Sequence, residues 1–151
     1  MATIHASAVL VGARAVLIRG PSGSGKSRLA LDLIAAGRAS SFSSLQFPFT
    51  RLIGDDRVEL IRTGGRLLVQ AAPALAGLIE VRGAGIFRLD HEPCAVVGLV
   101  VDLAATDAQR LPETSLITLE SVKLARLAVP EGASALPGIL ALLTFEVAAN
   151  A

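Results

Sequence analysis

The eight residues from Gly20 to Ser27 read Gly-Pro-Ser-Gly-Ser-Gly-Lys-Ser and match the G-x-x-x-x-G-K-[ST] pattern of a phosphate-binding loop. Glycines can adopt a positive φ, so the three in this run allow consecutive backbone N–H groups to face phosphate oxygens. In such a loop the lysine, here Lys26, adds charge at the β- and γ-phosphates, and the serine, here Ser27, ligates Mg²⁺. The run therefore predicts a site for a nucleoside triphosphate.

The elements on both sides of this loop support the prediction. An apolar run, Ala15–Ile18, suits a buried strand that leads into the loop. Apolar residues at helical spacing predict a helix over Ser27–Ala36, with Gly37 as its end. A helix that begins at the loop adds its partial positive charge there.

Two acidic features could decide which reaction such a loop serves. Asp55 and Asp56 follow an apolar strand pattern, where one carboxylate could act as a general base. Side chains of adjacent strand residues point to opposite faces, so the two cannot both enter one site unless the strand ends there. A solvated acidic turn before the next strand is the structural alternative for this pair.

Three further positions have both a structural and a functional interpretation. His5, on the first expected strand, reads on its own as a buried histidine with its hydrogen bonds satisfied. The run Ile79–Ile86 holds a charged pair followed by two glycines, which could form a bulged hairpin with a surface ion pair. Asp102 ends another apolar strand pattern and is a second candidate for an acidic metal ligand.

Composition narrows the class of protein. The chain has 151 residues, of which 52% are apolar, enough for one domain over residues 1–151. A net charge of +1 and an aromatic content of 3% argue against nucleic acid and anionic membranes as partners. Cys94 is the only cysteine, which excludes an intramolecular disulfide and favours a reduced, cytoplasmic setting.

Neither a secretory signal nor a membrane span is expected. The apolar stretch near Met1 lacks a preceding basic region. No charge-free apolar run approaches the ~18 residues that a membrane span requires.

The order of elements predicts an α/β fold in which one crossover helix is followed by many strands, giving a mixed, antiparallel-rich sheet. The segment 38–50 has neither helical nor strand periodicity and is expected to be a flexible insertion, either a lid or a disordered loop. A closing helix is expected at Ala133–Ala149. Strands are expected at Ile4–Val11, Ala15–Arg19, Arg51–Gly54, Val58–Arg62, Leu67–Gln70, Leu78–Val81, Ile86–Leu89, Val96–Leu103, Leu116–Leu119 and Val122–Val129.

Taken together and in this order, Ile4-His5, the loop 20–27, the run Leu52–Glu59 and the run Glu80–Ile86 resemble the HPr kinase/phosphorylase family. The resemblance covers the catalytic domain only, and the family's N-terminal domain has no counterpart in these residues. It implies a phosphate-loop fold of the HPr kinase and phosphoenolpyruvate carboxykinase type. It also implies an ATP- and Mg²⁺-dependent serine kinase that acts on HPr, the phosphocarrier protein of the sugar phosphotransferase system, and thereby regulates carbohydrate use.

The resemblance also implies roles for single residues. Ser27 and Glu80 would hold Mg²⁺, Asp55 or Asp56 would accept the proton of the substrate serine, and His5 would lie beside that carboxylate. Arg110 is similar to an arginine that the family supplies across a subunit interface, which is compatible with a homo-oligomer. The implied catalytic residues are His5, Lys26, Asp55, Asp56 and Arg110, and the implied nucleotide site comprises Gly20, Pro21, Ser22, Gly23, Ser24, Gly25, Lys26, Ser27, Glu80, Arg82, Gly83 and Gly85.

Three departures from the family pattern matter. Arg28 stands where the family usually has glutamate, and the insertion 38–50 separates the loop helix from the paired aspartates. The turn Val129–Ser134 lacks the arginines that the family ties to dephosphorylation, so we expect weak or absent phosphorylase activity.

Two other functions remain open at this point. In an unrelated small-molecule kinase or ATPase with the same loop, Asp102 would be the acidic metal-site residue. In a nucleotide-binding regulatory module without transfer chemistry, both Asp55 and Asp56 would be dispensable. The phosphate loop alone does not separate these functions.

Overall fold

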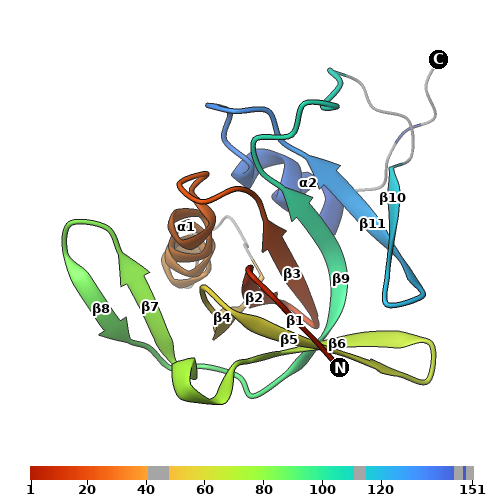
Figure 1. The fold of residues 1–151 in the computed structure, drawn as a ribbon. Helices are drawn as coiled ribbons and strands as arrows, with labels where there is room; N and C mark the ends of the chain where they lie inside the picture. The colour runs from red at the N-terminus through yellow and green to blue at the C-terminus, as the bar shows by residue number, and fades with distance from the viewer. Residues whose placement is uncertain (41–47, 111–114, 145–147, 149–151) are drawn as a thin grey trace.

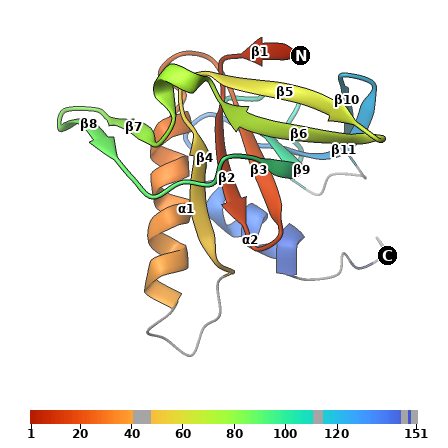
Figure 2. The same cartoon turned by 90° about the horizontal axis from the view of Figure 1, so that it is seen from below.

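A computed structural model describes residues 1–40, 48–110, 115–144 and 148. Nine strands form one mixed sheet in the order β1-β5-β6-β9-β3-β2-β4, with β11 also beside β9 and β10 beside β11. β7 and β8 form a separate two-stranded sheet that extends away from the body in both views (Figures 1 and 2). The strands are β1 Ala2–Ile4, β2 Ser7–Val11, β3 Arg14–Arg19, β4 Thr50–Gly54, β5 Val58–Thr63, β6 Arg66–Ala71, β7 Leu78–Val81, β8 Gly85–Arg88, β9 Ala95–Asp102, β10 Leu116–Leu119 and β11 Val122–Ala128, and the helices are α1 Lys26–Ser40 and α2 Leu136–Thr144, with a 3-10 turn at Pro73–Leu75.

The central strands β3 and β9 are parallel, and β9 is also parallel to β11, whereas the other strand pairs are antiparallel. This arrangement confirms the predicted mixed, antiparallel-rich sheet. Because β3 and β9 run the same way, Arg19 and Asp102 lie opposite each other at their carboxyl ends. The phosphate loop follows directly from this edge of the sheet.

Both faces of the central strands are covered. Val16 and Ile18 of β3 pack into a core with α1 and α2, whereas Ala15 and Leu17 pack on the other side against β5, β6 and β11. Strands that are buried on both faces read as continuous apolar runs rather than as alternating ones. This packing explains the unbroken apolar sequence before the loop.

The expected first strand, Ile4–Val11, is wrong as one element. The chain bends at His5 and divides the run into β1 and β2. β1 pairs with β5, whereas β2 pairs with β3 and β4. Hydrophobicity alone did not show this change of partner, because both halves are apolar.

The expected end of the loop helix at Gly37 is also wrong, because α1 continues to Ser40. A Cβ on Gly37 would collide with Thr50 Oγ1 and lie 2.9 Å from Thr50 Cβ and Cγ2. The glycine therefore permits β4 to pack closely against α1, and it does not end the helix.

The boundaries of the expected insertion and of the closing helix also differ from the prediction. Residues 38–40 belong to α1 and Thr50 to β4, while 41–47 lie outside the described residues. The last helix begins at Leu136 rather than Ala133, with Pro137 in the first turn, where proline is tolerated. Of the remainder of the expected helix, residues 145–147 and 149 lie outside the described part, and Ala148 is not helical. None of the helices in that part is long and apolar enough to cross a membrane.

We predict that Gly37→Ala destabilises the fold by about 1–3 kcal/mol, because the added methyl group overpacks the contact with Thr50. Gly138→Ala is the matched control: it also adds a methyl group in a helix, but there the nearest atom is Leu127 Cδ2 at 3.1 Å, the end of a flexible side chain. Urea unfolding of both variants measures the difference. Equal stability of the two variants would contradict the close-packing role of Gly37.

Candidate phosphate-binding and phosphoryl-transfer site

The phosphate loop connects the end of β3 to the start of α1. Gly23 and Gly25 have φ values of 81° and 97°, as the motif predicted. Gly20, at φ 158°, is close to extended; a Cβ there would lie 2.5 Å from Ser24 Oγ. Two of the three glycines therefore serve backbone conformation, and the third mainly serves close packing.

The side chains of the loop are poised for an anion. Lys26 Nζ donates hydrogen bonds to the carbonyl oxygens of Gly20 and Pro21, at 2.9 and 3.1 Å, so its charge lies over the loop. Ser24 Oγ is buried and has no hydrogen-bond partner among the described residues. A cationic side chain, a free hydroxyl group and a helix N-terminus together fit the phosphates of a nucleotide.

Asp55 is the centre of the polar contacts beside this loop. The residue is buried, with 2% of its surface exposed. Ser27 Oγ lies 2.8 and 3.0 Å from the two carboxylate oxygens, Ser7 Oγ donates to Oδ1 at 2.6 Å, and the Glu80 backbone N–H donates to Oδ2 at 3.1 Å. The predicted metal-binding serine is thus held directly by one of the paired aspartates.

Strand pairing explains how residues far apart in sequence meet here. Ala8 pairs with Gly54, and the register shifts between Ala8 and Val9; such an irregularity changes the direction in which side chains point. Gly54 permits the strand to end in a confined space, because a Cβ there would lie 2.9 Å from Val58 Cγ1. Ser7 directly precedes Ala8, and Asp55 directly follows Gly54. Because β2 and β4 are antiparallel, Ser7 and Asp55 therefore lie side by side.

Asp56 has a different environment from Asp55. It is exposed and has a φ of 66°, which turns the chain sharply after the buried aspartate. β4 ends at Gly54, so both carboxylates follow the strand and the alternation of strand side chains does not separate them. They differ in burial instead, because Asp55 is buried and Asp56 is exposed. A wholly solvated acidic turn is wrong for Asp55.

Glu80, on β7, contacts the site through its backbone N–H. Ile79 packs into the core beside α1, so Glu80, the next residue along the strand, faces the other way and is exposed. The turn after β7 contains Arg82 and Gly83, and Gly83 and Gly85 have φ values of 84° and 130°. The hairpin is confirmed, but the expected bulge is wrong, because the β7–β8 register is continuous; among the described residues Glu80 and Arg82 form no ion pair. The root of the hairpin is attached to Asp55 by the Glu80 amide.

His5 and Arg110 lie apart from these contacts. His5 is exposed in the bend between β1 and β2, so the expectation of a buried histidine is wrong. Arg110 is exposed after β9. In the described part of the chain, neither side chain donates a hydrogen bond to Asp55.

Asp102, the alternative metal ligand, is engaged in ion pairs. Arg19 binds both of its carboxylate oxygens, at 2.8 and 2.9 Å, and Arg126 Nε donates to Oδ2 at 2.6 Å. Arg126 also binds both carboxylate oxygens of Asp107. These contacts join the ends of β3, β9 and β11, so Asp102 stabilises the edge of the sheet from which the loop begins.

The titration of Asp102 reflects the same contacts. Partial burial by itself raises its pKa, but the hydrogen bonds and charges of Arg19 and Arg126 outweigh burial, so the pKa lies below its ordinary value. The two carboxylates also raise the pKa of Arg126. Asp102 is therefore an ionised partner of two guanidinium groups.

Sequence reasoning missed Ser7, and it did not anticipate the pairing of Arg19 and Arg126 with Asp102. Ser7 had a weak signal, since it is a lone hydroxyl group in an apolar strand. Arg19 and Asp102 each end an apolar strand, but their pairing depends on the parallel register of β3 and β9. Strand order cannot be read from either segment alone.

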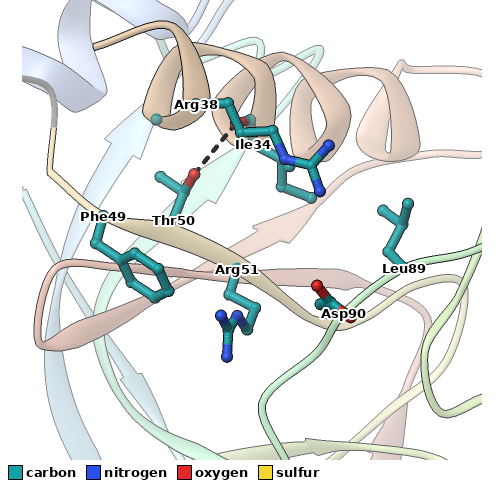
Figure 3. A pocket seen from close by; sticks show the side chains of 8 residues that line it. Ile34, Arg38, Phe49, Thr50, Arg51, Leu89 and Asp90 are labelled. Carbon is teal, nitrogen blue, oxygen red and sulfur yellow. Dashed lines mark hydrogen bonds between the residues drawn. The ribbon is translucent and has the colours of Figure 1, made fainter. Parts of the chain in front are cut away.

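A pocket of about 350 Å³ lies elsewhere, beside the C-terminal half of α1 (Figure 3). Phe49, Arg51, Leu89 and Asp90 line it together with residues of α1. Arg51 lies over the Phe49 ring and pairs with Glu92 at 3.0 Å. None of the lining residues belongs to the phosphate loop or contacts Asp55 in the part that the structure describes.

No group of three or more His, Cys, Asp or Glu side chains that could hold a metal occurs within residues 1–40, 48–110 and 115–144. A Mg²⁺ ion that accompanies a nucleotide needs no such group, because one or two protein oxygens and the phosphates suffice. The Ser27 hydroxyl with the Asp55 carboxylate behind it fits that kind of site.

Comparison with known proteins agrees with this geometry. The family described as HPr Serine kinase C-terminal domain matches residues 1–92. An HPr kinase/phosphorylase of Neisseria meningitidis is 33% identical over 114 residues, which cover 70% of this chain and 32% of that protein. One from Exiguobacterium is 41% identical over 87 residues, 57% of this chain and 24% of that protein.

The structure of the Hpr(Ser) kinase/phosphatase from Coxiella burnetii has the same fold, with a TM-score of 0.74 and 22% sequence identity over 95% of this chain and 93% of that one. The chain spans about a third of the length of the first curated relative. The family match covers more than half of the residues and includes the phosphate loop, the paired aspartates and Glu80. This chain belongs to the HPr serine kinase C-terminal domain family.

Proposed function

We propose that this chain is an ATP- and Mg²⁺-dependent serine kinase that phosphorylates the phosphocarrier protein HPr. The observation that carries the proposal is the contact between Ser27, at the end of the phosphate loop, and Asp55. This contact joins a phosphate-binding element to a carboxylate. Transfer of a phosphoryl group to a hydroxyl group requires both parts. The substrate is inferred from the relatives, which are HPr kinase/phosphorylases.

The residues divide the work of transfer. The loop amides and Lys26 orient and neutralise the phosphates, and Ser27 and Glu80 would hold Mg²⁺, which supplies charge neutralisation when bound. Asp55 accepts the proton of the substrate serine as its Oγ forms a bond to the γ-phosphorus and the bond to ADP breaks. Asp55 is favoured over Asp56 because it lies against Ser27.

The β7–β8 hairpin suits a protein substrate better than a small molecule. Ile86 is 71% exposed and Phe87 is 44% exposed, and an isolated two-stranded hairpin is only marginally stable in water. Ile86 is the cross-strand partner of Glu80. Ile86 lies on the same face of the hairpin as Glu80 and would be covered by a docked protein, whereas Phe87, the next residue, faces the other side.

The proposal extends to the setting of the protein. We infer that residues 1–151 form a single catalytic domain that acts in the cytoplasm and regulates carbohydrate use through the phosphotransferase system. We further propose that His5 acts near the acceptor serine, that Arg110 lies at a subunit boundary of a homo-oligomer, and that Arg82, Gly83 and Gly85 contribute to the nucleotide site. Nucleic acid and membrane are not among the proposed partners.

The proposal is tested by incubating the protein with labelled ATP, Mg²⁺ and purified HPr from the same organism, followed by mapping of the phosphorylated residue. We expect label on one serine of HPr, and none with Lys26→Ala, which removes the charge at the phosphates. ATP hydrolysis without label on HPr would contradict the substrate assignment.

Asp55→Asn and Asp56→Asn should differ strongly. We expect Asp55→Asn to bind nucleotide but to lower the rate of transfer by about 10²–10⁴-fold, the contribution of a general base. Asp56→Asn, on an exposed side chain, should stay within about tenfold of wild type. Stopped assays of HPr phosphorylation with both variants, checked for folding by circular dichroism, decide the point; near-equal rates would remove Asp55 from its role.

Asp102→Asn should affect stability rather than transfer. The pKa of Asp102 is lowered in the folded protein, so its stabilisation is complete above the ordinary value of 3.8 and is lost as the pH falls through the lower folded value. At pH 7 we expect Asp102→Asn to lower the free energy of unfolding by about 1.5–3 kcal/mol while phosphoryl transfer is retained. Below pH 4 the stability of the variant should depend less on pH than that of wild type.

Urea unfolding at several pH values measures this effect, with Asp107→Asn as the control, since that exposed pair with Arg126 is screened by solvent. Loss of transfer in a folded Asp102→Asn variant would favour the small-molecule kinase or ATPase, in which Asp102 binds the metal.

We also expect phosphorolysis to be weak or absent. An incoming inorganic phosphate needs fixed cations, yet the turn before α2 presents the exposed Glu131, and Arg126 is already paired with two carboxylates. Serine-phosphorylated HPr, given excess phosphate and Mg²⁺, should release little pyrophosphate. Release at a rate similar to the forward reaction would contradict this direction.

A further inference from the structure

Ser7 is buried beside the proposed site, and its hydroxyl group has no role in the function proposed above. It is 0% exposed and lies at the start of β2, 48 residues before its partner Asp55. Its Oγ donates to Asp55 Oδ1 at 2.6 Å, a length typical of a strong hydrogen bond to an ionised carboxylate. Within the described residues the buried polar side chains are Ser7, Thr50 and Asp55, so this contact is one of few in the interior.

The carboxylate of an aspartate rotates in a broad, roughly two-fold well, so its plane is set by its hydrogen bonds. Asp55 has three donors: the hydroxyl groups of Ser7 and Ser27 and the amide of Glu80. Two of these belong to parts that must respond to ligands, namely the phosphate loop and the hairpin. Ser7 is the donor that belongs to the central sheet, where β2 pairs with both β3 and β4.

We propose that Ser7 is a positioning residue that fixes the Asp55 carboxylate, and through it Ser27, for Mg²⁺-nucleotide binding and transfer. This inference rests on the proposed function for the identity of the reaction. A carboxylate held in one orientation accepts the hydrogen bond of the Ser27 hydroxyl group from one direction. The lone pairs of that hydroxyl group then face away from Asp55. Loss of the Ser7 hydroxyl group frees the carboxylate to rotate toward its two remaining donors.

The matched control is Thr50, another buried residue with a hydroxyl group. It lies on β4 and donates to the Ile34 carbonyl oxygen at 3.3 Å, away from the phosphate loop. Ser7→Ala and Thr50→Val each remove one buried hydroxyl group with little change in shape. Melting temperatures of both variants report any general loss of stability.

Two measurements separate a positioning role of Ser7 from a general structural role. They are nucleotide binding by calorimetry, with and without Mg²⁺, and steady-state phosphorylation of HPr. For Ser7→Ala we expect metal-free ATP affinity to equal that of wild type, the Mg²⁺-dependent gain in affinity to shrink about tenfold or more, and kcat to fall by a similar factor with little change in the KM for HPr. Thr50→Val should keep wild-type values of all three.

Wild-type kcat and Mg²⁺ response in Ser7→Ala would overturn the proposal. So would an equal loss in Thr50→Val, or an equal loss of metal-free affinity in Ser7→Ala, because these results would indicate a general structural effect. The binding measurements need no protein substrate. If wild type fails to phosphorylate HPr, the proposed function fails while the role of Ser7 is still decided by binding.

Discussion

The hydrogen bonds between Asp55 and Ser27 are the interaction on which the site depends. A buried carboxylate is costly unless its oxygens accept hydrogen bonds, and Asp55 receives them from β2, from the phosphate loop and from β7. The same contacts therefore satisfy a buried charge and join three segments that lie far apart in sequence. The folding requirement and the requirement of the chemistry coincide at this residue.

Asp102 shows how a second acidic strand end can have a different role. It is the last residue of β9, directly beside the strand that leads into the loop, and the sequence indicated this position as a candidate metal ligand. Two arginines neutralise it. The identity of the partners, serine and amide for Asp55 and guanidinium for Asp102, separates the carboxylate that faces the nucleotide from the one that stabilises the sheet.

Local signals were sufficient for the loop, for the individual strands and for the fold class, because each depends on periodicity or on glycines close together in sequence. The split of the first strand and the continuation of α1 through Gly37 depend on contacts with β5 and Thr50, which no local pattern shows. Likewise, the paired aspartates were visible in the sequence, but their division into a buried and an exposed residue required the turn at Asp56. The contact between Ser7 and Asp55 could not be predicted from local patterns, because it depends on the register between β2 and β4.

The most direct test is a crystal structure with Mg²⁺ and a non-hydrolysable ATP analogue. We expect phosphates along residues 20–27, the metal on the Ser27 hydroxyl oxygen, Asp55 still within hydrogen-bond distance of Ser27 and Ser7, and Asp102 still paired with Arg19. A metal ion bound to Asp102, with Arg19 displaced and Asp55 away from the nucleotide, would contradict this expectation.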